Sequence, residues 1–315
     1  MRLGVLDVGS NTVHLLLVDA HWGAHPTPMH SQRWTLKLAS LIGPDGALSD
    51  AGASSLIESV AEAAQAARDA ECEELLGFAT SAVRDASNSA EVLDAVTRTT
   101  GLQLQVLSGE DEARLTFLAV RRWFGWSAGN LLVLDIGGGS LEIAGGQDEE
   151  PTLAVSLPLG AGRMRREHLA GDPNGGPPGA PAVMALREHA LRVLAPAAGR
   201  IRAAGPFDRV AGSSKTFRTL ARLAGAAPTA AGPRIPRFLS VTALRQVTAF
   251  ISRMTPEDVG ALEGVSADRS GQLAAGAAVA LAAMTAAGVD EVQICPWALR
   301  EGVILQRLDQ LAFPE

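Results

Sequence analysis

Two glycine-rich segments of this chain are near-copies of one another, one at the N-terminus and one near the middle. The first reads LGVLDVGSNT at residues 3–12, and the second reads LVLDIGGGS at residues 132–140. Each is an apolar run that ends in Asp, continues through Gly and Ser, and gives way to another apolar run. This pattern predicts a β-hairpin whose tip presents backbone N–H groups beside a carboxylate. Because successive N–H groups in such a turn bind anions, we expect a duplicated fold that holds a phosphate chain from both sides.

The residues around the two hairpins predict two α/β domains, residues 1–125 and 126–315. The expected strands are 2–8, 13–19, 32–39, 74–80 and 103–107 in the first domain, and 131–136, 140–146, 152–157, 209–211 and 292–295 in the second. The expected helices are 49–70, 90–100, 110–123, 213–223 and an Ala-rich helix at 269–286. The segment GWSAG at 125–129 breaks the pattern and marks the predicted domain junction.

Four blocks of sequence point to a family. They are ATSAVRDA at 79–86, SGEDEARL at 108–115, DIGGGSLE at 135–142 and LPLGAGR at 157–163. In this order they resemble the signature blocks of the exopolyphosphatase and guanosine pentaphosphate phosphohydrolase (Ppx/GppA) family. Within that family, the residues of several blocks are most similar to those of the short, two-domain exopolyphosphatases of actinobacteria. The similarity is specific over residues 3–170 and continues more weakly through 212–216, 269–280 and 299–302.

The resemblance implies a fold. Members of this family have two actin-like, ribonuclease-H-like α/β domains of the acetate-kinase, sugar-kinase, heat-shock and actin superfamily, with a cleft between the domains. In that superfamily each domain contributes one phosphate-binding hairpin. The resemblance therefore agrees with the duplication that the glycine-rich segments indicate.

Two residues of the first domain are candidates for catalysis. Glu112, directly before Ala-Arg, matches the family's catalytic glutamate, which would orient and deprotonate the attacking water. Without the resemblance, Glu112 reads as one of three acidic residues that offset the positive end of a helix dipole. Arg84 matches the arginine of a family motif and would neutralise charge on the transferring phosphoryl group, although a plain surface arginine is the alternative.

Carboxylates flank both hairpins. Asp135 and Glu142 stand on either side of the second hairpin, and their hard oxygen ligands suit Mg²⁺ or Mn²⁺. Asp7 is the symmetry mate of Asp135 and is expected to share the metal or to position water. A turn-forming role for Asp135 and an exposed strand position for Glu142 are the structural alternatives. The expected donors to phosphate oxygens are Gly9, Ser10, Asn11, Gly137, Gly138, Gly139 and Ser140.

A basic pair replaces a feature of the superfamily's ATPases. Lys215 and Arg218 lie where those ATPases usually have a small, glycine-rich adenosine-binding turn. Two cationic side chains suit a long polyanion better than a purine, and we therefore assign both to phosphate binding, with solvated helix residues as the alternative. His14, in the second predicted strand, is interpreted as structural.

Composition limits the partners. The net charge of −7 argues against a general nucleic-acid binder, which usually carries a basic face. No apolar run approaches the length that spans a bilayer, and the chain begins directly with a predicted strand. The two cysteines, Cys72 and Cys295, have no CxxC spacing. We expect a cytoplasmic protein without nucleic-acid or membrane partners, and a homodimer is left open.

The function expected from the resemblance is metal-dependent release of terminal phosphate from inorganic polyphosphate. We expect short chains to be preferred, because the chain lacks the C-terminal domain that lengthens the groove of larger relatives. The first alternative is the same chemistry on guanosine pentaphosphate, which the motifs do not separate from polyphosphate hydrolysis. A superfamily kinase and a non-catalytic sensor of polyphosphate or the alarmone are further alternatives. The basic pair disfavours the kinase, and the intact acidic residues disfavour the sensor.

Overall fold

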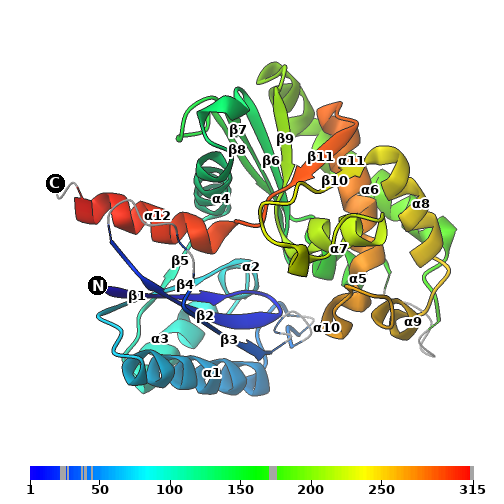
Figure 1. Ribbon diagram of the computed structural model, residues 1–315. Coiled ribbons are helices and arrows are strands. Elements are labelled where there is room, and N and C mark those ends of the chain that lie inside the picture. The colour runs from blue at the N-terminus through cyan, green and yellow to red at the C-terminus, as the bar shows by residue number, and fades with distance from the viewer. Residues whose placement is uncertain are drawn as a thin grey trace. The chain divides into compact units, whose positions relative to one another are not determined.

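The computed structural model describes the chain except residues 22–25, 27, 37, 39–40, 44, 170–175 and 313–315. Within the described residues the backbone divides into two units (Figure 1). The first unit comprises Met1–Leu115 and Leu299–Glu315, and the second comprises Thr116–Ala298. The division falls inside helix α4 (Gly109–Phe124), ahead of the junction predicted at residue 125.

The first unit is built on a five-stranded sheet with the order β3-β2-β1-β4-β5. Its strands are β1 (Arg2–Val8), β2 (Thr12–Asp19), β3 (His30–Thr35), β4 (Glu74–Ala79) and β5 (Leu104–Val106). Strands β1 to β3 form an antiparallel meander, while β4 and β5 join the other side of β1 in parallel. This mixed arrangement is the ribonuclease-H-like sheet that the resemblance implies.

Alternation along β1 decides which helices cover each face of this sheet. Leu6 and Val8 point into a core shared with α1 (Asp50–Asp69) and α3 (Ser89–Thr100). Leu3 and Val5 point to the other face, where the buried residues include Ile304 and Leu308 of α12 (Leu299–Ala312). Successive side chains of a strand face opposite ways, so both faces are buried. Figure 1 shows α1 and α12 on opposite sides of the sheet. The short α2 (Ser81–Arg84) follows β4.

The place of α12 differs from the predicted domain division, which assigned the whole of residues 126–315 to the second domain. The helix belongs to the first unit because its apolar side chains complete the second face of that unit's sheet. Gly302 permits a close approach of α12 to α4, since a Cβ at this position would lie 2.0 Å from the carbonyl oxygen of Leu115, a residue of α4. A side chain there would clash with the backbone of α4.

The second unit repeats the meander. Its six-stranded sheet has the order β10-β11-β9-β6-β7-β8, in which β6, β7 and β8 are antiparallel neighbours and β9 joins β6 in parallel. The strands are β6 (Leu131–Ile136), β7 (Leu141–Gly146), β8 (Leu153–Leu157), β9 (Arg209–Gly212), β10 (Phe238–Ser240) and β11 (Glu291–Ile294). The duplication predicted from the glycine-rich segments is confirmed, since β6 to β8 repeat the arrangement of β1 to β3.

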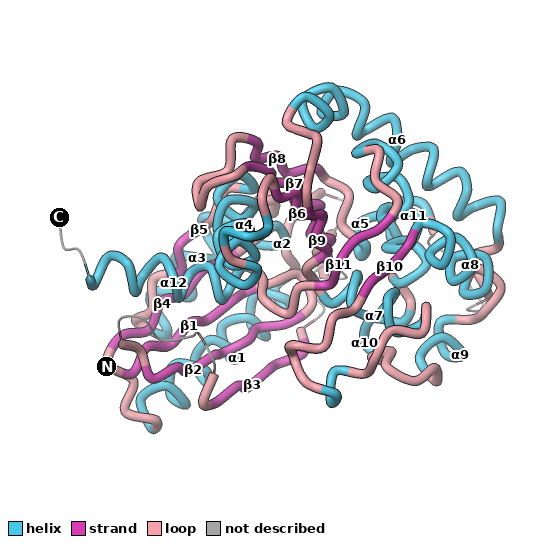
Figure 2. The backbone as a smooth tube through the Cα atoms, turned by 45° about the horizontal axis from the view of Figure 1, so that its top comes forward, coloured by secondary structure: helices cyan, strands magenta, loops and turns pink. Residues whose placement is uncertain are grey.

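Helices of the second unit bury a single large core. They are α5 (Ala161–His168), α6 (Ala180–Ala203), α7 (Lys215–Leu223), α8 (Val241–Ile251), α9 (Pro256–Gly260), α10 (Ala267–Ser270) and α11 (Leu273–Ala287), with short 3₁₀ turns η2 (Trp126–Ala128) and η3 (Thr229–Ala231). The Ala-rich α11 is buried along almost its whole length, because small side chains let the neighbouring helices approach. Figure 2 shows α6, α8 and α11 grouped beside β9 and β11.

The helix predicted at 269–286 is two helices. It breaks at Gly271, between α10 and α11. The guanidinium of Arg165 packs against that glycine, and a Cβ there would lie 2.7 Å from the Arg165 Cζ. Among the described residues, no helix combines the length and apolar character needed to cross a bilayer.

Candidate active site

The two hairpin tips have the same backbone geometry. In the first, the Gly9 N–H donates to the carbonyl oxygen of Thr12 at 3.0 Å, and in the second the Gly137 N–H donates to that of Ser140, also at 3.0 Å. Ser10 and Ser140 are both buried. The predicted turns are confirmed at both places, and each leaves a glycine-rich backbone at the end of a buried strand.

The second hairpin is supported from behind by the start of α5. Gly160 lies so close that a Cβ would be 2.3 Å from the Gly139 carbonyl carbon and from the Ser140 nitrogen. The Ala161 N–H donates to the Gly137 carbonyl at 3.0 Å, and the Arg163 N–H donates to the Gly138 carbonyl at 2.9 Å. These contacts explain the block LPLGAGR, which fixes the hairpin's shape through backbone hydrogen bonds.

Asp135 and Glu142 lie on facing strands of the second hairpin. They are directly opposite one another in the register of β6 and β7. The Ser213 hydroxyl, which is fully buried at the end of β9, donates to Asp135 Oδ2. The Ser156 hydroxyl, opposite Glu142 on β8, donates to Glu142 Oε1 at 2.9 Å. Each carboxylate is therefore oriented by a serine that the sequence interpretation did not include.

This acidic pair fits a hard cation. Two cross-strand carboxylates, each fixed by a hydroxyl, can hold Mg²⁺ or Mn²⁺ together with waters and phosphate oxygens. Within the described parts of the chain, no cluster of three or more His, Cys, Asp or Glu side chains is arranged to hold a metal ion. Magnesium does not require such a cage, because it usually keeps several waters and takes one or two carboxylates.

Glu112 is held in the first turn of α4. Its backbone N–H donates to the Ser108 carbonyl at 3.0 Å, and the Ser108 hydroxyl accepts from the Asp111 N–H at 3.1 Å. These bonds are those of a helix N-cap. Glu112 is 7% exposed. A buried carboxylate needs a partner, which neutral helix residues do not supply.

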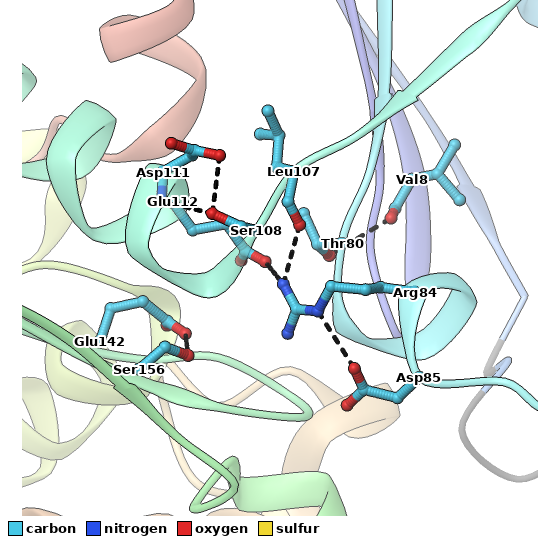
Figure 3. A network of polar contacts seen from close by, with 10 residues as sticks. All are labelled: Val8, Thr80, Arg84, Asp85, Leu107, Ser108, Asp111, Glu112, Glu142 and Ser156. Atoms are coloured by element: carbon cyan, nitrogen blue, oxygen red, sulfur yellow. Dashed lines mark hydrogen bonds and ion pairs between the residues drawn. The ribbon is translucent and has the colours of Figure 1, made fainter.

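Arg84 supplies that partner. Its Nη1 donates to Glu112 Oε1 and, at 3.0 Å, to the Leu107 carbonyl, while its Nε donates to Asp85 Oδ1 at 3.0 Å (Figure 3). Burial alone would lower the pKa of Arg84, but the charges of Glu112 and Asp85 outweigh burial and raise it. The guanidinium is thus fixed beside the candidate base. Sequence reasoning placed the two residues at one site but did not foresee their direct contact.

The first hairpin has different side chains around it. Asp7 lies opposite His14 in the register of β1 and β2, which is the relation that Asp135 has to Glu142. The Asp7 carboxylate lies 3.5 Å from Nη1 of Arg300, at the start of α12. Arg300 falls in the weakly matching block at 299–302, and only that block could have signalled it.

Lys215 and Arg218 have different surroundings in the structure. Lys215 lines a small cavity of the second unit together with Ser266, Arg269 and Gln272. Arg218, one turn further along α7, donates from Nε to the Ser214 carbonyl at 3.2 Å and is not among the lining residues. The structure therefore pairs Lys215 with Arg269, which the sequence interpretation did not assign to binding.

An acidic residue stands beside that pair of cations. Burial raises the pKa of Asp268, but a hydrogen bond from the Ser266 hydroxyl and the charges of Lys215 and Arg269 lower it further than burial raises it. Asp268 consequently offsets part of the positive charge around the cavity.

Comparison with known proteins agrees with the motifs. The sequence matches the Ppx/GppA phosphatase family over residues 17–311. It is 58% identical over 312 residues to exopolyphosphatase 1 of Mycobacterium tuberculosis, covering 99% of this chain and 90% of that protein. It is 26% identical over 299 residues to the guanosine-5'-triphosphate,3'-diphosphate pyrophosphatase of Aeromonas hydrophila, covering 95% of this chain and 58% of that protein.

A solved structure shares the fold. The exopolyphosphatase of Cytophaga hutchinsonii superposes with a TM-score of 0.86 at 22% sequence identity, and the match covers 98% of both chains. The chain belongs to the Ppx/GppA phosphatase family.

Proposed function

We propose that this chain is an exopolyphosphatase, a hydrolase that releases terminal phosphate from inorganic polyphosphate. The observation that carries the proposal is the buried Glu112, fixed by Arg84 at the start of α4. The 58% identity to a protein named exopolyphosphatase 1 supports the same reaction. Polyphosphate is the substrate class that two phosphate-binding hairpins suit.

Glu112 is the general base of the proposed reaction. The Arg84 guanidinium can only donate hydrogen bonds, so the Glu112 oxygen that it contacts is an acceptor and the carboxylate is held in one orientation. From that position Glu112 would accept the proton of the water that attacks the terminal phosphorus. The leaving group is a shortened polyphosphate, which departs as a stable anion, and a strong general acid is not required.

The hairpins position the phosphates. Backbone N–H groups of Asn11, Gly138 and Gly139 and the hydroxyls of the hairpin serines would donate to phosphate oxygens. Asp135 and Glu142 would hold Mg²⁺ or Mn²⁺, with Ser213 and Ser156 orienting the two carboxylates. When bound, the ion neutralises charge on the phosphate oxygens.

We extend the proposal to a preference for short chains. Lys215 and Arg269 line the cavity of the second unit, but Asp268 offsets part of their charge. The charge of Asp268 reduces the net positive charge that would hold distal phosphates there, and additional chain length would add less binding energy. A cytoplasmic location is part of the same proposal.

Replacement of Glu112 by Gln tests the mechanism. An amide keeps the shape but cannot take up the water's proton, and a positioned general base contributes about 10²- to 10⁴-fold in rate. We expect phosphate release from tripolyphosphate to fall by about a hundred-fold or more, with affinity nearly intact. Glu110→Gln is the matched control, because Glu110 lies in the same helical turn with its side chain 65% exposed. A Glu112→Gln protein that keeps more than about a third of the parent rate would remove Glu112 from the mechanism.

Guanosine pentaphosphate is the second candidate substrate. The 26% identity to the Aeromonas hydrophila protein supports it, and both substrates end in the same phosphoanhydride. The two candidate substrates are distinguished by kcat/KM measured at one Mg²⁺ concentration. The compounds compared are tripolyphosphate, a polyphosphate of several hundred units and guanosine pentaphosphate. We expect tripolyphosphate to be the best substrate. A ten-fold or greater advantage for guanosine pentaphosphate would make the alarmone the substrate, and an advantage for the long polymer would refute the short-chain argument.

A further inference from the structure

An arginine from the far end of the chain lies beside the first hairpin. Asp7 and His14 face each other across β1 and β2, on the same side of the sheet as Leu3 and Val5. That side is the one covered by α12, which begins at Leu299. Arg300, in the first turn of α12, therefore reaches the strand ends from which the hairpin projects.

Two side chains hold the Arg300 guanidinium. Its Nη1 lies 3.5 Å from Asp7 Oδ2 and donates a hydrogen bond to His14 Nδ1. Because arginine has no acceptor, His14 Nδ1 must be unprotonated, and the proton of the neutral ring is on Nε2. Nε2 then donates to the Ser31 hydroxyl at 2.7 Å. The imidazole is locked at both nitrogens, and it fixes Arg300 in turn.

Burial and charge keep His14 in this neutral form. The side chain is 2% exposed. Burial, followed by the charges of Arg300 and Arg33, lowers the pKa of His14 from 6.5 to about 3. His14 is consequently a hydrogen-bond acceptor for Arg300 at every pH at which the protein would be expected to work.

The two hairpins are alike in backbone but differ in charge. In the second, the cross-strand pair is Asp135 and Glu142, which would together attract a cation. In the first, the corresponding pair is Asp7 and His14, and the cation beside them is the chain's own Arg300. A guanidinium at a glycine-rich turn is well suited to bind phosphate oxygens.

Arg300 retains the means to contact a phosphate. Both of its contacts to Asp7 and His14 use Nη1, so the donors of Nη2 are not taken by them. Its side chain is 21% exposed, as is that of Asp7. The Asp7 carboxylate also lies next to the hairpin turn. If Gly9 carried a Cβ, that atom would be 3.9 Å from Asp7 Oδ1.

We propose that Arg300 binds a substrate phosphate at the first hairpin, and that Asp7 and His14 are positioning residues that hold its guanidinium there. Asp7 then serves Arg300 rather than a metal ion, unlike its symmetry mate Asp135. This inference rests on the proposed polyphosphate hydrolysis, because it names a residue that would bind the same substrate.

The test compares Arg300→Ala with Arg307→Ala. Arg307 lies two turns further along α12 and makes a comparable ion pair, with Nε 3.0 Å from Glu74 Oε2, so it controls for loss of an arginine that attaches this helix to the sheet. Tripolyphosphate affinity is measured by calorimetry in Glu112→Gln protein, which binds without turnover. We expect Arg300→Ala to weaken binding by about ten- to a hundred-fold, the usual effect of a hydrogen bond to a charged group, and Arg307→Ala to leave it unchanged.

Chemical rescue and metal dependence give two further readouts. Free guanidinium ion at millimolar concentration should restore part of the kcat/KM lost in Arg300→Ala, which a disturbed helix would not allow. Asp7→Asn should weaken tripolyphosphate binding without raising the Mg²⁺ concentration needed for half-maximal activity, whereas Asp135→Asn should raise that concentration. His14→Ala should weaken tripolyphosphate binding, and His14→Gln should recover part of that loss, because an amide can accept from Arg300 and donate to Ser31.

The outcomes separate the inference from the proposed function. Parental tripolyphosphate affinity in Arg300→Ala, equal losses in Arg300→Ala and Arg307→Ala, or a raised Mg²⁺ requirement in Asp7→Asn would each overturn the inference alone. Parent protein that neither binds nor hydrolyses tripolyphosphate would overturn the proposed function and this inference with it.

Discussion

Acid sensitivity of the first unit should depend on one buried imidazole. His14 has a pKa of about 3 in the folded protein against 6.5 for an unperturbed histidine. Between these two values the unfolded chain binds a proton that the folded chain does not, so the free energy of unfolding decreases as the pH falls. His14→Gln removes this titration while keeping one acceptor for Arg300 and one donor for Ser31.

The magnitude follows from the size of the shift. One pKa unit corresponds to about 1.4 kcal/mol. A pH of about 5 lies some 1.5 units below the pKa of an unperturbed histidine and well above the pKa of His14 in the folded protein. Lowering the pH from about 7 to about 5 should therefore cost the parent about 2 kcal/mol more than it costs His14→Gln.

Urea unfolding at the two pH values measures the difference. The parent's loss of unfolding free energy is compared with that of His14→Gln and of a control, His30→Gln, which changes an exposed residue of β3. The control should behave as the parent does. Equal pH dependence in parent and His14→Gln, or an imidazole signal of His14 that titrates near pH 6 by NMR, would show that His14 is not held neutral by burial and Arg300.

Two further predictions concern the second hairpin. Gly160→Ala should destabilise the protein by about 2 kcal/mol or more and lower phosphate release, because the added Cβ would be 2.3 Å from hairpin backbone atoms that cannot rotate away. The control is Gly199→Ala in α6, where nothing lies within 4 Å of the new Cβ, and it should stabilise the protein by about 0.5–1 kcal/mol in the same thermal unfolding assay. Equal effects of the two substitutions on stability would refute the close packing. Ser213→Ala should weaken Mn²⁺ binding by about ten-fold and Asp135→Asn by more, since a residue that orients a metal ligand typically contributes about 10- to 100-fold in affinity. A calorimetric Mn²⁺ titration in which both variants bind as the parent does would contradict a metal ion at the Asp135 carboxylate.

Local features of the sequence determined the hairpins and the catalytic helix. Each hairpin is set by apolar runs on both sides of a glycine turn, and each turn is closed by a hydrogen bond between residues three apart. The start of α4 is likewise local, because Ser108 caps the helix that carries Glu112. Interactions over a few residues depend on residue type and spacing alone, which a sequence displays directly.

Tertiary packing decided which side chains surround those local features. Arg300 and His14 are 286 residues apart and meet only because α12 buries its apolar side chains on the β1 face. Ser213 reaches Asp135 across 78 residues, because β9 pairs in parallel with β6. The different chemistry of the two similar hairpins arises from these long-range contacts. Burial of apolar surface drives them without regard to sequence separation, and no spacing rule along the chain records them.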